Sequence, residues 1–121
     1  MAPGEAARAQ VSSFRPEDVA LEPIDVSGSV LDGRPEWRAA TPWRAADGGL
    51  VVGCFRSSPG RFSVSQTRDE AIFVRAGHVI VSGEDGSTVD CRAGDVIALT
   101  RDTTYVFDIR EALENVYVTS P

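Results

Sequence analysis

Few side chains in this 121-residue chain have the chemistry of metal ligands or nucleophiles. The chain contains one histidine, His78, and two cysteines, Cys54 and Cys91, which lie far apart and outside any CxxC spacing. A zinc site built from imidazoles and thiolates needs about four such groups, so this class of site is excluded. All twelve basic residues are arginines, which excludes Schiff-base chemistry and a lysine-bound pyridoxal cofactor.

The remaining reactive side chains have ordinary structural interpretations as well. We expect both cysteines to be reduced, buried and packed as small apolar groups. His78 has the only side chain whose ordinary pKa lies near neutrality; we expect it at the surface or at an interface, and a role as a base stays open. Ser63 and Ser65 are not surrounded by the GxSxG elbow of a serine hydrolase.

Composition and charge exclude several classes of partner. Hydrophobic residues make up 42% and charged residues 25% of the chain, which is typical of a single globular domain. The net charge of -6 argues against nucleic acid or an anionic membrane as a partner, because both require a basic face. No apolar run is long enough to span a bilayer, and Met1–Gln10 lacks the apolar core of a secretory signal. We therefore expect a cytoplasmic protein.

The N-terminal part of the sequence is interpreted as a leader followed by an arm. Residues 1–12 are expected to be flexible, and residues 13–48 to form an arm with short strands. Ser13 precedes acidic residues in a pattern that predicts a short helix with a hydroxyl cap, ended before Pro23. Trp37 and Trp43 are expected to anchor the arm to a sheet.

Residues 49–121 read as short strands separated by turn dipeptides, which predicts an all-β barrel or sandwich. Asp85-Gly86 predicts a hairpin, Gly77 a tight reversal between two strands, and Asp95 a side chain that binds amides of its own turn. Residues 110–113 are expected to form at most one helical turn. The expected strands are Leu50–Phe55, Arg61–Ser65, Ala71–Ala76, His78–Ser82, Thr88–Cys91, Val96–Thr100, Thr104–Ile109 and Asn115–Thr119.

Several motifs in this order and spacing resemble the cupin superfamily. They are Gly53, Pro59-Gly60-Arg61-Phe62, the run DEAIFVRAGHVIV, Asp85-Gly86, the run RAGDVIAL, Tyr105-Val106-Phe107-Asp108 and Val116-Tyr117-Val118. The resemblance is to the subgroup that includes ureidoglycine aminohydrolase-like and ethanolamine-utilisation-Q-like proteins. It implies a double-stranded β-helix, a small jelly-roll-like barrel that is often dimeric and holds its ligand inside.

The resemblance also indicates where a metal would bind. The positions that carry metal-binding histidines and a glutamate in metal cupins fall here at Ser63, Ser65, Glu70 and Tyr105. Because hydroxyl groups are weak ligands for first-row metals, we predict no bound metal and no other cofactor.

A carboxylate and a phenol remain as candidate catalytic groups. If Glu70 points into the barrel, alternation places Ile72 and Val74 there too, facing Tyr105, Phe107 and Ile109 on another strand. Burial among apolar walls would raise the pKa of Glu70, which suits a general acid or base. The alternative interpretation is that Glu70 occupies a former metal-ligand position and now has only a structural role. The expected ligand-binding residues are Ser63, Ser65, Gln66, Thr67, His78, Phe107 and Tyr117.

Two function classes follow. In the first, the chain is a metal-independent enzyme of isomerase, cyclase or lyase type that acts by proton transfer on a small carbonyl-containing metabolite, with Glu70 and Tyr105 as catalytic residues. In the second, it is a non-catalytic cupin that binds a small molecule or has a structural role. A homodimer is expected in both cases, mainly from the resemblance. Residues 21–43 carry more apolar side chains than a free loop exposes, so this segment either covers the barrel of its own chain or adds strands to a partner.

Overall fold

The fold was analysed in a computed structural model, which describes residues 11–26 and 28–121. Residues 1–10 of the expected leader lie outside the described residues. Within the described part of the chain, no helix has the length and apolar character needed to cross a membrane.

The described residues are almost entirely β-strand, which confirms the predicted all-β class. The one helical element among them is the 3₁₀ turn Pro16–Asp18. The strands are β1 (Glu22–Ile24), β2 (Ser29–Asp32), β3 (Trp37–Arg44), β4 (Val51–Ser57), β5 (Gly60–Gln66), β6 (Glu70–Gly83), β7 (Thr88–Arg92), β8 (Val96–Leu99) and β9 (Thr103–Thr119).

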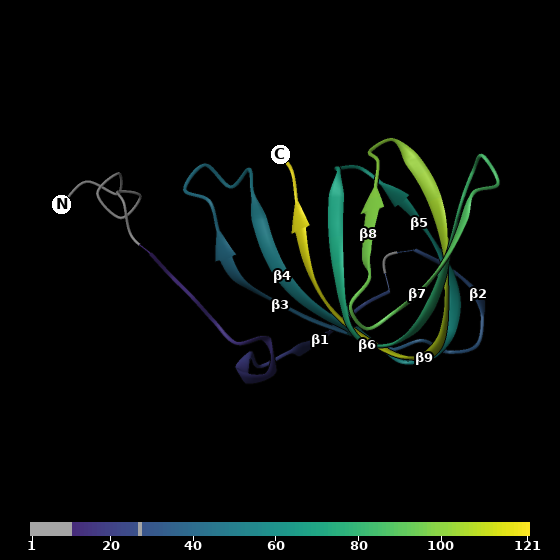
Figure 1. The fold of residues 1–121 in the computed structure, drawn as a ribbon, viewed down its shortest axis with the longest axis horizontal. Helices are drawn as coiled ribbons and strands as arrows, with labels where there is room; N and C mark the ends of the chain where they lie inside the picture. The colour runs from purple at the N-terminus through teal and green to yellow at the C-terminus, as the bar shows by residue number, and fades with distance from the viewer. Residues whose placement is uncertain (1–10, 27) are drawn as a thin grey trace.

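The two longest strands, β6 and β9, shape the barrel. Each descends one side of the molecule, crosses its lower end and rises on the other side (Figure 1). The first half of β6 pairs with β8 and with the last residues of β9, whereas its second half pairs with β7 and with the first residues of β9. Both strands therefore belong to two opposing parts of one curled sheet.

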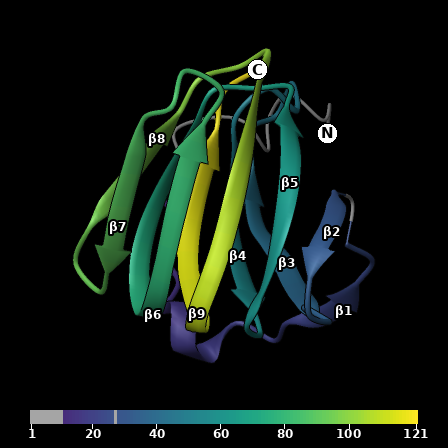
Figure 2. The ribbon, with the colours of Figure 1, turned by 90° about the vertical axis from the view of Figure 1, so that its right-hand side faces the viewer.

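We call these two parts the first and the second wall. The first wall has the order β1-β3-β4-β9-β6-β8, and the second has the order β2-β5-β9-β6-β7. In Figure 2 the second wall faces the viewer, with β7, β6, β9, β5 and β2 side by side. Two walls that share bent strands are the arrangement expected of a double-stranded β-helix.

The core lies between the walls and is built from alternate side chains of each strand. Ile72 and Val74 of the first wall and Phe107 and Ile109 of the second are buried, as predicted. Trp37 is only 7% exposed, and its ring packs edge-on against Phe62 with the centroids 4.9 Å apart. Trp37 therefore anchors the arm to the sheet, as predicted.

Trp43 does not anchor the arm in the same way, because 37% of its surface is exposed. The short helix also begins differently from the prediction. Its N-cap residue is Arg15, without a side-chain cap, so the predicted hydroxyl cap from Ser13 is wrong. Pro16 at the first helical position, whose fixed φ suits a helix start, supplies the signal instead.

The turns predicted from Gly and Asp are confirmed in two places. The β6–β7 hairpin turns at Gly86, which has a φ of +85°, and Asp95 Oδ2 accepts the Arg92 backbone N–H at 2.8 Å. Cys54 and Cys91 are buried free thiols, as expected.

The reversal predicted at Gly77 is wrong, because Gly77 lies within the continuous strand β6. Its φ of +95° and the register shifts around it mark a β-bulge that bends the strand. A Cβ on Gly77 would lie 2.1 Å from the carbonyl oxygen of Ala112 on β9. Residues 110–113, predicted as at most a helical turn, are the part of β9 that bends alongside it.

Substituting Gly77 should therefore cost far more stability than substituting a glycine that only needs a positive φ. Gly86 is the matched control, because its φ is +85° and no atom lies within 4 Å of an added Cβ. We expect Gly86→Ala to lose about 1 kcal/mol in urea unfolding, and Gly77→Ala to lose at least about 3 kcal/mol or fail to fold. Equal losses would contradict the role assigned to the close approach of β6 and β9.

Candidate functional site

A cavity of about 280 Å³ lies between the two walls. Most of its lining is apolar or aromatic, and none of the lining side chains is an arginine. The lining residues are Ile24, Trp37, Ala39, Phe55, Phe62, Val64, Gln66, Glu70, Ile72, Leu99, Phe107, Leu113, Asn115 and Tyr117.

Glu70 is the acidic residue of this lining, and it lies at the first position of β6. It faces inward because it alternates with Ile72, as the sequence predicted. Gln66, the last residue of β5, donates a hydrogen bond from Nε2 to Glu70 Oε1 at 2.8 Å. Burial raises the pKa of Glu70, and the hydrogen bond from Gln66 opposes that rise only in part. The neutral carboxylic acid of Glu70 therefore persists to a higher pH than is usual for a glutamate.

Tyr117 is the phenol that shares the cavity with Glu70. It lies opposite Ile72 on β9, so it is a diagonal neighbour of Glu70 on the same face. Its ring covers Gly53 on β4, where an added Cβ would lie 2.0 Å from the ring carbon Cζ. Burial raises the pKa of Tyr117, a hydrogen bond with Thr41 lowers it, and the charge of Glu70 raises it further.

Two polar groups in the lining have no partner among the described residues. They are the indole nitrogen Nε1 of Trp37 and the side-chain oxygen Oδ1 of Asn115. Both residues are buried, with 7% and 5% of their surfaces exposed. A buried polar group without a partner costs about 1–3 kcal/mol. A ligand that accepts a hydrogen bond from Trp37 and donates one to Asn115 would recover that cost.

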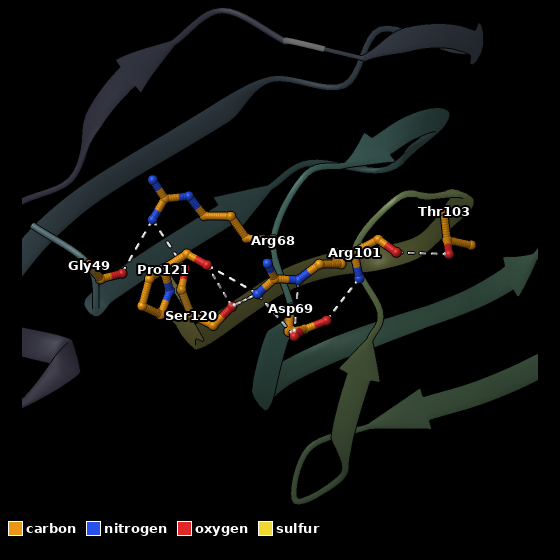
Figure 3. A network of polar contacts seen from close by, with 7 residues as sticks. All are labelled: Gly49, Arg68, Asp69, Arg101, Thr103, Ser120 and Pro121. Carbon is orange, nitrogen blue, oxygen red and sulfur yellow. Dashed lines mark hydrogen bonds and ion pairs between the residues drawn. The ribbon is translucent and has the colours of Figure 1, made fainter.

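Next to Glu70, a network of polar contacts joins four segments of the chain (Figure 3). Asp69 accepts hydrogen bonds from the Arg101 backbone N–H at 2.9 Å and from Arg101 Nε at 3.3 Å. Arg101 Nη2 donates to Ser120 Oγ at 2.8 Å, and Arg68 Nη1 donates to the carbonyl oxygens of Ser120 and Gly49. The hydrogen bonds from Arg101 lower the pKa of Asp69. The network fixes the start of β6, where Glu70 begins.

The predicted orientation of Ser63 and Ser65 toward the cavity is corrected by the structure. Along β5 the cavity is lined by Phe62, Val64 and Gln66, so alternation places both serines on the outer face. Ser65 Oγ instead lies 3.3 Å from Thr104 Oγ1. The positions of β5 that accompany Glu70 inside the barrel are thus Val64 and Gln66, one residue away from those inferred from spacing.

Of the other predicted site residues, Gln66, Phe107 and Tyr117 line the cavity, whereas Tyr105, Thr67 and His78 do not. The hydroxyl oxygen of Tyr105 accepts the Thr100 backbone N–H at 2.9 Å, so the structure does not pair Tyr105 with Glu70. Thr67 is exposed in the loop before β6.

His78 lies on the outer face of β6, since Val79 beside it is buried in the core. Its Nε2 is 2.7 Å from Asp90 Oδ1 on β7. The bulge at Gly77 decides this orientation, because it reverses which residues of β6 face inward.

A first-row metal ion does not fit the side chains of the cavity. Their possible donors are one carboxylate, two amides and one phenol, without imidazole or thiolate. Glu70, the carboxylate, already accepts a hydrogen bond from Gln66. Within residues 11–26 and 28–121, no group of three or more His, Cys, Asp and Glu side chains could hold a metal.

Two site residues were missed by the sequence reasoning. Trp37 was expected only as an anchor, and Asn115 was given no role. Alternation along β9 supplied the signal for Asn115, because it lies two residues before Tyr117 and therefore shares its face. No comparable signal was available for Trp37, because its position depends on the pairing of β3 with β4.

Structural comparisons support the fold. The EutQ protein of Clostridium difficile is 18% identical, with 90% of this chain and 86% of that chain covered at a TM-score of 0.75. A DUF861-family protein of unknown function from Pseudomonas syringae pv. tomato is 20% identical, with 85% and 45% covered at 0.73. The cupin domain of Cnp3 from Schizosaccharomyces pombe is 13% identical, with 92% and 74% covered at 0.69.

Sequence comparison identifies the family. No curated protein matches the chain, but the family model of the EutQ-like cupin domain matches residues 44–117. These residues include β4 to β8 and most of β9, with Glu70, Gln66, Asn115 and Tyr117 of the cavity. The chain belongs to the family of EutQ-like cupin domains.

Proposed function

We propose that this cupin binds a small uncharged metabolite between its two walls and exchanges a proton with it through Glu70. The observation that supports this most directly is the partly buried carboxyl of Glu70 in a largely apolar cavity, with its pKa raised by burial. A carboxyl tuned toward neutrality works as a general acid or base at ordinary pH.

The class of ligand follows from the charges and polar groups of the lining. Because no arginine of the described residues lines the cavity, a ligand carboxylate or phosphate would be buried without a counter-ion, which is costly. The free N–H of Trp37 suits a carbonyl oxygen, and the free oxygen of Asn115 suits an N–H or O–H donor. A compact molecule with one carbonyl and one donor meets both requirements.

The chemistry would be of isomerase, cyclase or lyase type and would not depend on a metal. Glu70 would take or give the proton, while the Trp37 N–H stabilises negative charge that develops on the carbonyl oxygen. Tyr117 would take the place of Tyr105 as the catalytic phenol. Tyr117 is the phenol of the lining, and it neighbours Glu70 on the same face.

Binding without chemistry is the second candidate. The hydrogen bond between Gln66 and Glu70 favours it, because a carboxyl held in place by its neighbour also suits a purely structural role. Turnover separates the two candidates once a ligand is known. We expect Glu70→Gln to lower turnover by about 100-fold or more, whereas full activity in that variant would leave only the binding role.

A homodimer remains part of the proposal. Phe73 and Val96 are paired on the outer face of the first wall, with 43% and 58% of their surfaces exposed. Apolar side chains gathered on one face suit a protein interface.

Ligand binding can be tested by filling the cavity. Ala39→Leu adds side-chain volume to the lining, whereas Ala98→Leu adds the same volume on the exposed outer face of β8 and serves as the control. In a thermal-shift screen of small uncharged carbonyl compounds, we expect hits to stabilise wild type and Ala98→Leu but not Ala39→Leu. Hits that stabilise all three proteins equally would place the ligand elsewhere.

The raised pKa of Glu70 makes a prediction about stability and pH. The unfolded carboxyl titrates near its ordinary value of 4.5, so the folded protein should lose unfolding free energy as pH rises from there through the raised pKa. Glu70→Gln cannot ionise but keeps an oxygen for Gln66, so its stability relative to wild type should increase over that range. A difference that is independent of pH would contradict the burial of this carboxyl.

The oligomeric state can be checked by light scattering at micromolar concentration. We expect a particle of twice the chain mass of 12.9 kDa, and Phe73→Ser should shift it toward the monomer. A monomeric wild type would remove the dimer from the proposal.

A further inference from the structure

A second cavity, of about 440 Å³, lies on the outer side of the first wall, under the segment that includes the 3₁₀ turn. Figure 1 shows that turn at the foot of β3 and β4. We call this cavity the outer pocket. It differs from the barrel cavity in being rich in charged side chains. Its lining residues are Pro16, Glu17, Val19, Leu21, Arg38, Cys54, Phe55, Arg56, Arg75, Glu114 and Asn115.

Three of these residues are arginines that come from three different strands. Arg38 of β3 lies directly opposite Arg56 of β4 in the register of the sheet. Like charges in directly opposite positions destabilise a sheet, so this arrangement carries a cost. Arg75 approaches the same pocket from β6.

The acidic side chains of the outer pocket compensate two of the three arginines. Arg56 Nη2 lies 2.5 Å from Glu114 Oε1, and Arg75 Nη2 lies 3.2 Å from Glu17 Oε2. Among the residues that the structure describes, Arg38 has neither an ion pair nor a side-chain hydrogen bond. The pocket thus keeps an excess positive charge in a chain whose net charge is -6.

The floor of the outer pocket adds no negative charge. Cys54 is buried there, and burial raises the pKa of its thiol above the ordinary value of 9.0 while the charge of Arg75 lowers it in part. The thiol therefore remains neutral near pH 7.

We propose that the outer pocket is a binding site for a small oxyanion of the phosphate type, held between the guanidinium groups of Arg38 and Arg56. Guanidinium groups form paired hydrogen bonds with such oxygens, and an anion between the two arginines relieves their repulsion. Glu17, on the covering segment, competes with the anion for positive charge by holding Arg75. Phe55 and Asn115 line both cavities, but the three arginines line the outer pocket and not the barrel cavity, so this proposal does not rest on the function proposed for the barrel.

The test uses calorimetric titration of the whole protein with inorganic phosphate at constant ionic strength. We expect saturable binding to wild type, weakened by about tenfold or more in Arg38→Gln and in Arg56→Gln. Arg92→Gln is the matched control, because Arg92 is an exposed arginine of the second wall with 65% of its side chain accessible. It removes the same charge and should leave the affinity unchanged.

Two further variants keep the test decisive. Arg38→Lys keeps the charge and the fold but loses the planar group, so it should bind phosphate more weakly than wild type. Glu17→Gln releases Arg75 and should bind phosphate more tightly. The proposal is overturned if wild type shows no saturable binding, or if Arg38→Gln and Arg92→Gln bind phosphate equally well.

Discussion

The close contact between the backbones of β6 and β9 at Gly77 is the constraint on which the architecture depends. Only a residue without a Cβ fits there, because the carbonyl oxygen of Ala112 occupies that space. The bulge bends β6 while β9 bends beside it, so two strands supply both walls. It also changes the phase of β6, since Ile72 and Val74 face inward before it and Val79 and Val81 after it. The barrel cavity follows from this bend.

Charge is distributed unevenly between the outside and the inside of the barrel. Asp69 and Glu70 are neighbours in sequence, yet their pKa values shift in opposite directions. Asp69 faces Arg101 in an exposed network, whereas Glu70 faces a largely apolar cavity and accepts a hydrogen bond from the amide of Gln66. Alternation along an extended chain is sufficient to produce this contrast. Among the described residues, no arginine lines the barrel cavity, whereas three line the outer pocket and come from β3, β4 and β6.

Much of the fold could be predicted from the sequence because its signals are local. Alternating apolar residues located the strands, and Asp85-Gly86 and Asp95 located two turns. Gly77 was misread because a glycine with positive φ serves a reversal and a bulge equally well. Only the pairing of distant strands distinguishes the two cases. Two pairs of predicted segments thus merged into β6 and β9.

The site was predicted less completely than the fold. Glu70, Gln66, Phe107 and Tyr117 line the cavity, and strand alternation predicted the inward direction of Glu70 and Phe107. The spacing of the metal-cupin motif differs from the observed phase of β5 by one residue, and a shift of one residue moves every side chain of a strand to the other face. Ser63 and Ser65 were assigned to the interior for that reason. Trp37 depends on pairing between β3 and β4, which no local pattern reports.

The bare backbone at Gly53 carries a consequence for how such a chamber can change during evolution. The ring of Tyr117 occupies the space that a side chain at Gly53 would fill. A methyl group added at Gly53, which lies outside the lining, would displace the ring of Tyr117 and change the volume available to a ligand. Ligand preference within this fold can therefore change through substitutions at Gly53, although Gly53 itself does not line the cavity.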